Sequence, residues 1–236
     1  MQQYCYRKLP QNSNVTRLLR LLPRRDSPEH IRCELFEYII PKSSTNPYEA
    51  LSYCWGGEEK PKSILIIGDQ DRKNDQELAV TENLYVALSR LQDCILPRII
   101  WVDAVCIDQT NREEKATQIQ LMPAIYAKAC RVIVWLGAEQ DGSDKAFDLI
   151  ISAANASVTA SNTQQPLEQE IQELLNRPWF SRVWVRKCIG LLPVGVTKTQ
   201  IGSPRDCCCS KYCNHVRLGR NRWICLLPRA RPFTTK

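Results

Sequence analysis

The chain has 236 residues, with 32 Lys and Arg against 25 Asp and Glu, and 12 Cys. This length is sufficient for one domain with a hydrophobic core, and 44% hydrophobic residues is typical of a globular rather than a disordered protein. The net charge of +7 is uneven, because residues 1–185 carry −3 (21 basic, 24 acidic) and residues 186–236 carry +10, which argues against a specific nucleic-acid partner for the bulk of the chain.

The chain begins with the sequence MQQYCYRKLP, which lacks the apolar stretch of a secretory signal peptide. The apolar runs, such as residues 64–67 and 99–102, have the length of a strand, so no membrane span is expected. We therefore expect a cytoplasmic protein with reduced thiols.

The first half of the chain predicts strands. An apolar segment containing two arginines runs over residues 15–22, and alternation predicts a half-buried strand at 31–38. Further strands are expected at 48–55, ending at a Gly pair, and at 63–67. A helix then begins at Thr81, with one apolar face formed by Leu84, Ala87, Leu88 and Leu91.

The second half alternates strands with helices. Strands are predicted at 98–102 and 131–136, and helices at 112–129, 144–154 and 167–176. The expected apolar face of the 112–129 helix, which contains a proline, consists of Ala116, Ile119, Met122, Tyr126 and Ala129. This pattern predicts an α/β fold with a mostly parallel central sheet flanked by helices. Binding sites in such folds lie beyond the carboxyl ends of the strands, here residues 52–57, 103–111 and 137–141.

Four motifs in these regions carry a family resemblance. They are YEALSYCWG at 48–56, IWVDAVCIDQ at 100–109, RVIVWLG at 131–137 and RPWFSRVW at 177–184. In this order they resemble the fungal heterokaryon-incompatibility (HET) domain. The resemblance implies a role in fungal non-self recognition, with growth arrest or cell death as the outcome. HET domains are also remotely similar to the TIR domains of innate immunity, some of which cleave NAD, and this similarity implies a TIR-like sheet.

The resemblance suggests three parts. Residues 1–14 are an N-terminal lead-in, residues 15–185 are the HET-like domain, and residues 186–236 are a basic, Cys-rich tail. Family likeness and helical periodicity both stop at the tail, so we interpret it as disordered, or as the product of a truncated or frame-shifted gene model. The alternative is a metal-binding appendix whose candidate ligands are Cys207, Cys208, Cys209, Cys213 and His215. Because these residues lack the spacing of a zinc site, no metal site is expected.

Glu114 is the candidate catalytic residue. It follows the polar segment after a buried strand, where a carboxylate would face a bound ribose. An alternative is a capping box, in which Asn111 accepts a hydrogen bond from a backbone N–H and Glu114 reaches back. Thr110 and Glu113 offer the same pattern one residue earlier.

The candidate ligand-binding residues surround the same strand ends: Ser52, Trp55, Asp103, Asp108, Gln109 and Arg182. The two aspartates are equally suited to binding ribose hydroxyls and to capping the turn that follows them. Trp55 would stack on a base or pack as a lid on the core, and Arg182 would meet an anion or stack on nearby rings. Cys106 has no histidine in a matching motif, which disfavours a thiol nucleophile.

Three functions remain open from the sequence. The leading one is a HET-type effector domain that acts by self-association or by binding a protein partner. The second is a TIR-like glycohydrolase that uses Glu114 and takes NAD or a related nucleotide as substrate; no cofactor is otherwise expected. The third is an inactive, truncated fragment.

Overall fold

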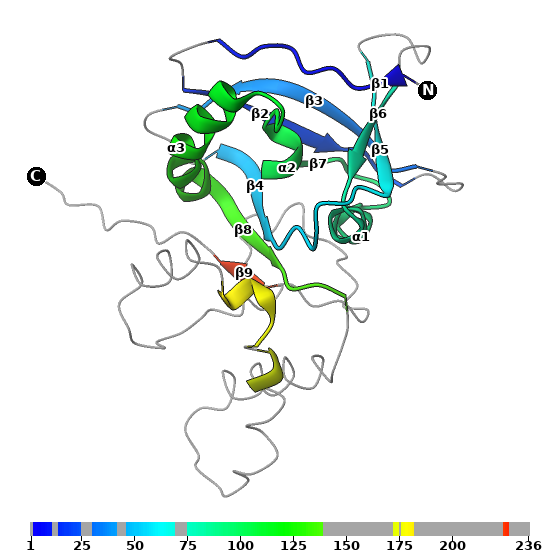
Figure 1. The fold of residues 1–236 in the computed structure, drawn as a ribbon, viewed down its shortest axis with the longest axis vertical. Coiled ribbons are helices and arrows are strands. Elements are labelled where there is room, and N and C mark those ends of the chain that lie inside the picture. Colours follow the sequence, from blue (N-terminus) through cyan, green and yellow to red (C-terminus); the bar gives the residue numbers. More distant parts are fainter. Residues whose placement is uncertain are drawn as a thin grey trace, which may run out of the picture. The chain divides into compact units, whose positions relative to one another are not determined.

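The computed structural model describes residues 2–10, 14–24, 30–41, 46–68, 75–138, 172–174, 176–181 and 224–226 (Figure 1). The strands are β1 (Gln2–Gln3), β2 (Val15–Leu21), β3 (Arg32–Ile39), β4 (Asn46–Tyr53), β5 (Lys62–Ile66), β6 (Gln76–Val80), β7 (Arg98–Trp101), β8 (Ala129–Trp135) and β9 (Ile224–Leu226). The helices are α1 (Glu82–Leu91), α2 (Asp103–Cys106), α3 (Arg112–Lys128) and the 3-10 helix η2 (Pro178–Ser181).

Among the described residues, the strands up to β8 form a sheet in the order β1-β6-β5-β3-β2-β7-β4-β8. The pairs β1–β6, β3–β5 and β4–β7 are parallel, whereas β2–β3, β2–β7 and β5–β6 are antiparallel. The α/β class is confirmed, and the sheet is mixed where a mostly parallel one was expected. The described residues place helices between β6 and β7 and between β7 and β8. The strands β5 and β6 are antiparallel neighbours, and an antiparallel pair needs no crossover helix.

The chain divides into two compact units between Ile133 and Val134. The first contains β1 to β7 and the helices α1 to α3. In the second, Arg177 donates a hydrogen bond from Nη1 to the Leu136 carbonyl at 3.2 Å. The rings of Trp179 and Phe180 there pack edge to face, with centroids 5.0 Å apart.

The apolar segment expected at 15–22 is the central strand β2, which lies between β3 and β7. It is buried along most of its length, and its buried residues include Thr16 and Arg17. Its register places Leu19 opposite Leu35 on one side and Ile100 on the other. The Thr16 hydroxyl accepts a hydrogen bond from Nε1 of Trp101 at 3.0 Å, so one of the two buried polar side chains of β2 has a partner within the core.

Helix α1 is confirmed as predicted. Thr81 is its N-cap, and its side chain accepts from the Leu84 amide at 3.4 Å. All four residues of the predicted apolar face are buried: Leu84, Ala87, Leu88 and Leu91. Burial of this face explains why a ten-residue helix is stable here, since short isolated helices are marginal in water.

Helix α3 is confirmed in extent, but its predicted face is partly wrong. Ile119 is 51% exposed, and the buried residues are Gln118 and Ile125. Gln118 donates from Nε2 to the Val15 carbonyl at 2.8 Å. The inward face of α3 is thus partly polar, which a search for apolar periodicity cannot detect.

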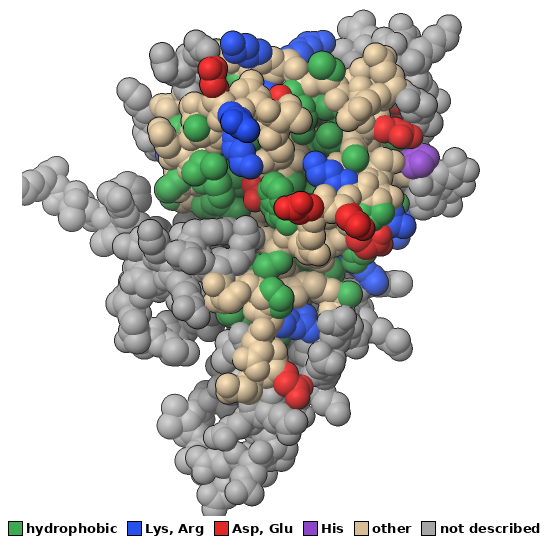
Figure 2. Space-filling view, in the orientation of Figure 1, with side chains coloured by type: hydrophobic (Ala, Val, Ile, Leu, Met, Phe, Trp, Pro, Cys, Tyr) green, Lys and Arg blue, Asp and Glu red, His purple; other side chains and the backbone are tan. Residues whose placement is uncertain are grey.

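The remaining predictions for the second half lie mostly outside the described residues. The helix at 144–154 is one of these, and of the helix at 167–176 the described residues 172–174 are helical. No helix in the described part of the chain is both long and apolar enough to cross a membrane. On the face seen in Figure 2, basic and acidic side chains are interspersed over the described residues.

Truncating Leu88 tests the packing of α1. Leu88 has no exposed surface, so Leu88→Ala should lower the free energy of unfolding by about 2–5 kcal/mol through lost burial and a residual cavity. Ile95 is 80% exposed, and Ile95→Ala should change it by less than about 0.5 kcal/mol. Urea titration of the full chain measures both, and equal losses would contradict the observed burial of α1.

Candidate functional site

The candidate catalytic residue, Glu114, forms a buried ion pair with Arg17 of β2. Its Oε1 accepts from Arg17 Nη1 at 2.5 Å and its Oε2 from Nη2 at 3.0 Å. Oε1 also accepts from the Asp108 amide at 2.8 Å. The two side chains are only 3% and 6% exposed. In this geometry both carboxylate oxygens are occupied by donors of the protein itself.

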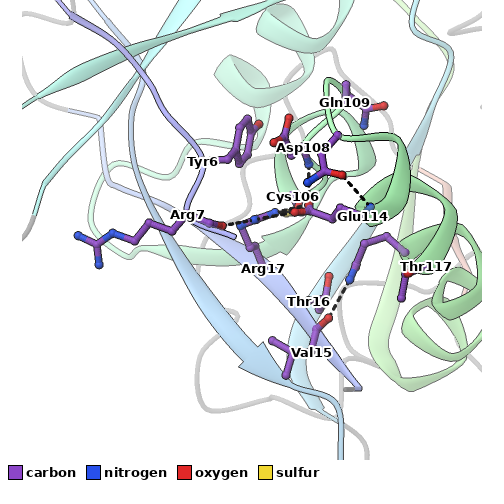
Figure 3. Close-up of polar contacts among 12 residues, drawn as sticks. Tyr6, Arg7, Val15, Thr16, Arg17, Cys106, Asp108, Gln109, Glu114 and Thr117 are labelled. Carbon is purple, nitrogen blue, oxygen red and sulfur yellow. Dashed lines mark hydrogen bonds and ion pairs between the residues drawn. The ribbon is translucent and has the colours of Figure 1, made fainter. Parts of the chain in front are cut away.

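The Arg17 guanidinium makes three further contacts, with Cys106, Arg7 and Tyr6 (Figure 3). It donates to the Cys106 carbonyl at 3.1 Å and to the Arg7 carbonyl at 2.6 Å. The Tyr6 ring lies 5.0 Å away, within cation–π distance. Burial lowers the pKa of Arg17, but the hydrogen bond and charge of Glu114, together with Tyr4 and Tyr6, raise it, and the net direction is upward. Arg17 therefore stays charged, and its counter-ion is Glu114.

The capping interpretation is correct for Asn111 and wrong for Glu114. Asn111 Oδ1 accepts from the amides of Glu113 and Glu114, both at 3.1 Å. The Glu114 carboxylate does not return to the cap residue, because it neutralises Arg17. The alternative pair is also not formed, since the Thr110 hydroxyl donates to Asp108 Oδ1 at 2.6 Å.

Three of the ligand-binding candidates meet where β4 and β7 end: Trp55, Asp103 and Gln109. Because these strands are parallel neighbours, residues that follow them lie together. Trp55 Nε1 donates to Asp103 Oδ2 at 3.1 Å. Gln109 Nε2 donates to the Asp103 carbonyl at 2.9 Å, while its Oε1 is buried with no hydrogen-bond partner in the described part of the chain. Residues 103–114 thus link this corner to Glu114.

The other candidates are placed differently. Asp108 closes a turn, because its Oδ1 accepts from the Thr110 amide at 3.0 Å. Ser52 lies within β4 and is 2% exposed, so it does not form part of the surface. Arg182 lies outside the described residues.

Cys106 does not have the properties of a nucleophile. It is fully buried, and its Sγ accepts from the Val102 amide at 3.4 Å. Burial raises the pKa of the Cys106 thiol to about 12, so the thiol stays protonated at neutral pH. This agrees with the expectation from the sequence.

Sequence reasoning missed the basic partners of the buried carboxylates. The sequence signal that would have found Arg17 is its position among apolar residues in a predicted strand, because a buried cation there needs a counter-ion.

Sequence analysis also missed a second cluster of charged residues. Glu49 on β4 binds Arg98 Nη2 at 2.7 Å, and its other oxygen binds Arg131. This cluster ties β4 to β7 and β8 at a site distinct from the Arg17–Glu114 pair.

A family model described as heterokaryon incompatibility protein (HET) matches residues 48–187, more than half of the chain. The chain belongs to the HET family. The HET match begins within β4 and includes α1 to α3, so it contains Glu114 and Trp55. Arg17 lies before it. The ion pair therefore joins the matched HET region to a strand that precedes it in the sequence.

This HET domain is similar to heterokaryon incompatibility protein 6, OR allele, of Neurospora crassa. The two are 33% identical over 144 residues, which cover 58% of this chain and 21% of the relative. The chain thus matches about a fifth of the length of that relative. No solved structure matches the chain.

Neutralising Glu114 should strongly destabilise the HET domain. Glu114→Gln leaves Arg17 buried without its counter-ion, and the free energy of unfolding should fall by about 3–5 kcal/mol. Glu34→Gln is the matched control. Glu34 pairs with Arg20 at 2.7 Å with side chains 39% and 43% exposed, so its loss should cost at most about 1 kcal/mol. Urea denaturation measures both.

A double variant tests whether the unpaired arginine causes the destabilisation expected for Glu114→Gln. Arg17→Met with Glu114→Gln removes both charges, and it should be more stable than Glu114→Gln alone. If the double variant is no more stable, the loss does not arise from an uncompensated arginine.

Alkylation should distinguish buried from exposed thiols. At pH 8, iodoacetamide should modify Cys5, Cys94 and Cys130, which are exposed, and leave the buried Cys33 and Cys106 unmodified until urea is added. Peptide mass spectrometry reads each site. Native modification of Cys106 at the rate of Cys94 would show that the Cys106 thiol is accessible.

Proposed function

We propose that this chain carries a HET effector domain that acts in fungal vegetative incompatibility and promotes growth arrest or cell death. Membership of the HET family and the similarity to heterokaryon incompatibility protein 6 support this role. The domain acts by associating with a second copy or with a protein partner. It works in the cytoplasm and needs no nucleic acid, in keeping with the mildly acidic residues 1–185.

One observation supports partner binding over catalysis at Glu114: the Glu114 carboxylate is buried and fully paired with donors of the protein. Both oxygens of Glu114 accept protein hydrogen bonds, and its side chain is 6% exposed. A substrate would have to displace Arg17 and leave it unpaired, at a cost of about 3–5 kcal/mol. In the state described here, Glu114 therefore stabilises the fold and does not offer a free carboxylate.

The second candidate function is a glycohydrolase that takes NAD or a related nucleotide. The observation that favours it is the corner formed by Trp55, Asp103 and Gln109, which the polar segment 103–114 connects to Glu114. Trp55 would stack on a ring of the substrate, and the unpartnered Oε1 of Gln109 would accept a hydroxyl proton. Once released from Arg17, Glu114 would stabilise positive charge developing on the ribose.

Expression in a filamentous fungus, combined with an NAD assay, separates the two functions. The wild-type chain should arrest growth, and the purified protein should release no nicotinamide from NAD. The variant Arg17→Met with Glu114→Gln, in which no buried charge is left unpaired, should still arrest growth if partner binding is the mechanism. Glu34→Gln serves as the control for expression and folding.

Two results would contradict the proposal. Catalytic nicotinamide release by the wild type that is lost in the folded double variant would identify the enzyme. Unimpaired growth with soluble, folded wild-type protein would exclude an effector role for this chain alone.

A further inference from the structure

The N-terminal segment lies across the domain as a strap, defined here as residues 2–10. At one end, β1 is the edge strand of the sheet and pairs with β6, with Gln2 opposite Gln76 and Gln3 opposite Glu77. The Tyr4 amide adds a hydrogen bond to the Glu77 carbonyl at 2.8 Å. The strap is thereby fixed to the edge of the sheet, far in sequence from Glu114.

The middle of the strap closes over the Arg17–Glu114 pair (Figure 3). The Tyr6 hydroxyl donates to the carbonyl of Val105 in α2 at 2.9 Å, and the Tyr6 ring lies against the Arg17 guanidinium. The Arg7 carbonyl accepts from Arg17 Nη2 at 2.6 Å. Because these contacts cover the guanidinium on the side away from Glu114, the strap completes the burial of Arg17.

The strap has less secondary structure than the pair that it covers. Residues 4–10 belong to no helix or strand, and among their side chains Leu9 is buried, Tyr4 and Tyr6 are half-buried, and the others are exposed. The pair itself is carried by β2 and α3. Segments with few buried contacts and no secondary structure open locally at lower free energy than the elements of the core.

We propose that the strap is an autoinhibitory cover, which detaches from α2 and Arg17 while the sheet stays folded and thereby opens the Arg17–Glu114 pair to ligands. When the strap leaves, water replaces the Arg7 carbonyl and the Tyr6 ring. Hydration raises the local dielectric and weakens the attraction between Arg17 and Glu114. The uncovering is argued from these contacts alone, whereas its inhibitory consequence rests on the second candidate function, in which Glu114 acts on a nucleotide.

Carboxyl labelling of the full chain tests the cover. Carbodiimide with glycine ethyl ester modifies accessible carboxylates, and peptide mass spectrometry reads Glu114 and the partly exposed Glu34 separately. Tyr6→Ala removes the anchor on α2 and the ring against Arg17. Labelling of Glu114 should rise about tenfold over the wild type, while that of Glu34 stays constant. Tyr6→Phe, which loses only the hydroxyl, should give an intermediate increase.

Tyr85→Ala is the matched control. Tyr85 is a half-buried tyrosine of α1 whose ring lies 5.7 Å from Lys62 Nζ. It should leave Glu114 labelling at the wild-type level. Hydrogen exchange in Tyr6→Ala should increase in the strap and at the Asp108 amide, and remain unchanged in β7.

The outcomes are distinct. Wild-type labelling of Glu114 in Tyr6→Ala overturns the proposal, because the pair is then closed without the strap. Increased exchange in β7 and the strap together also overturns it, because the strap is then an integral part of the fold. If Glu114 labelling rises selectively but neither growth arrest nor nicotinamide release changes, the cover stands and the functional role of the pair fails.

Discussion

The buried ion pair between Arg17 and Glu114 is the interaction on which the rest of this domain depends. An unpaired charge in the interior of a protein is strongly unfavourable, so neither residue is tolerated there without the other. Arg17 belongs to the central strand β2 and Glu114 to the first turn of α3, 97 positions later. Their pairing therefore fixes the first turn of the helix against the strand.

Other polar contacts extend this constraint across the first unit. Glu49 bridges Arg98 and Arg131, and so joins β4 to the strands on either side of it. Two tyrosine hydroxyls tie α3 to β4 from opposite directions: Tyr48 donates to the Ile125 carbonyl at 2.7 Å, and Tyr126 donates to the Leu51 carbonyl at 3.1 Å. Such contacts add little net stability each, but they leave few alternative arrangements, because breaking one leaves a buried group unsatisfied.

The ion pair also links family membership to the question of mechanism. Glu114 lies inside the matched HET region and Arg17 outside it, so the environment of Glu114 depends on sequence that precedes the match. A carboxylate that neutralises a buried arginine is unavailable to a ligand until that arginine is hydrated or displaced. The strap contacts the Arg17 guanidinium through the Arg7 carbonyl and the Tyr6 ring, so the N-terminal segment forms part of the surroundings of the pair.

The sequence by itself determined the α/β class, the family, helix α1 with its apolar face, and the extent of α3. These follow from local periodicity, from the Thr81 and Asn111 caps, and from motifs contiguous in the chain. Tertiary structure alone decided the mixed pairing of the sheet, the polar inward face of α3 and the partner of Glu114. Strand direction depends on which strands become neighbours, and a salt bridge spanning 97 residues leaves no periodic trace. The capping box illustrates this difference. The prediction for Asn111, which depends on neighbouring residues, was correct. The Glu114 carboxylate instead pairs with the distant Arg17, because a buried arginine without a counter-ion costs more free energy than the local capping hydrogen bond provides.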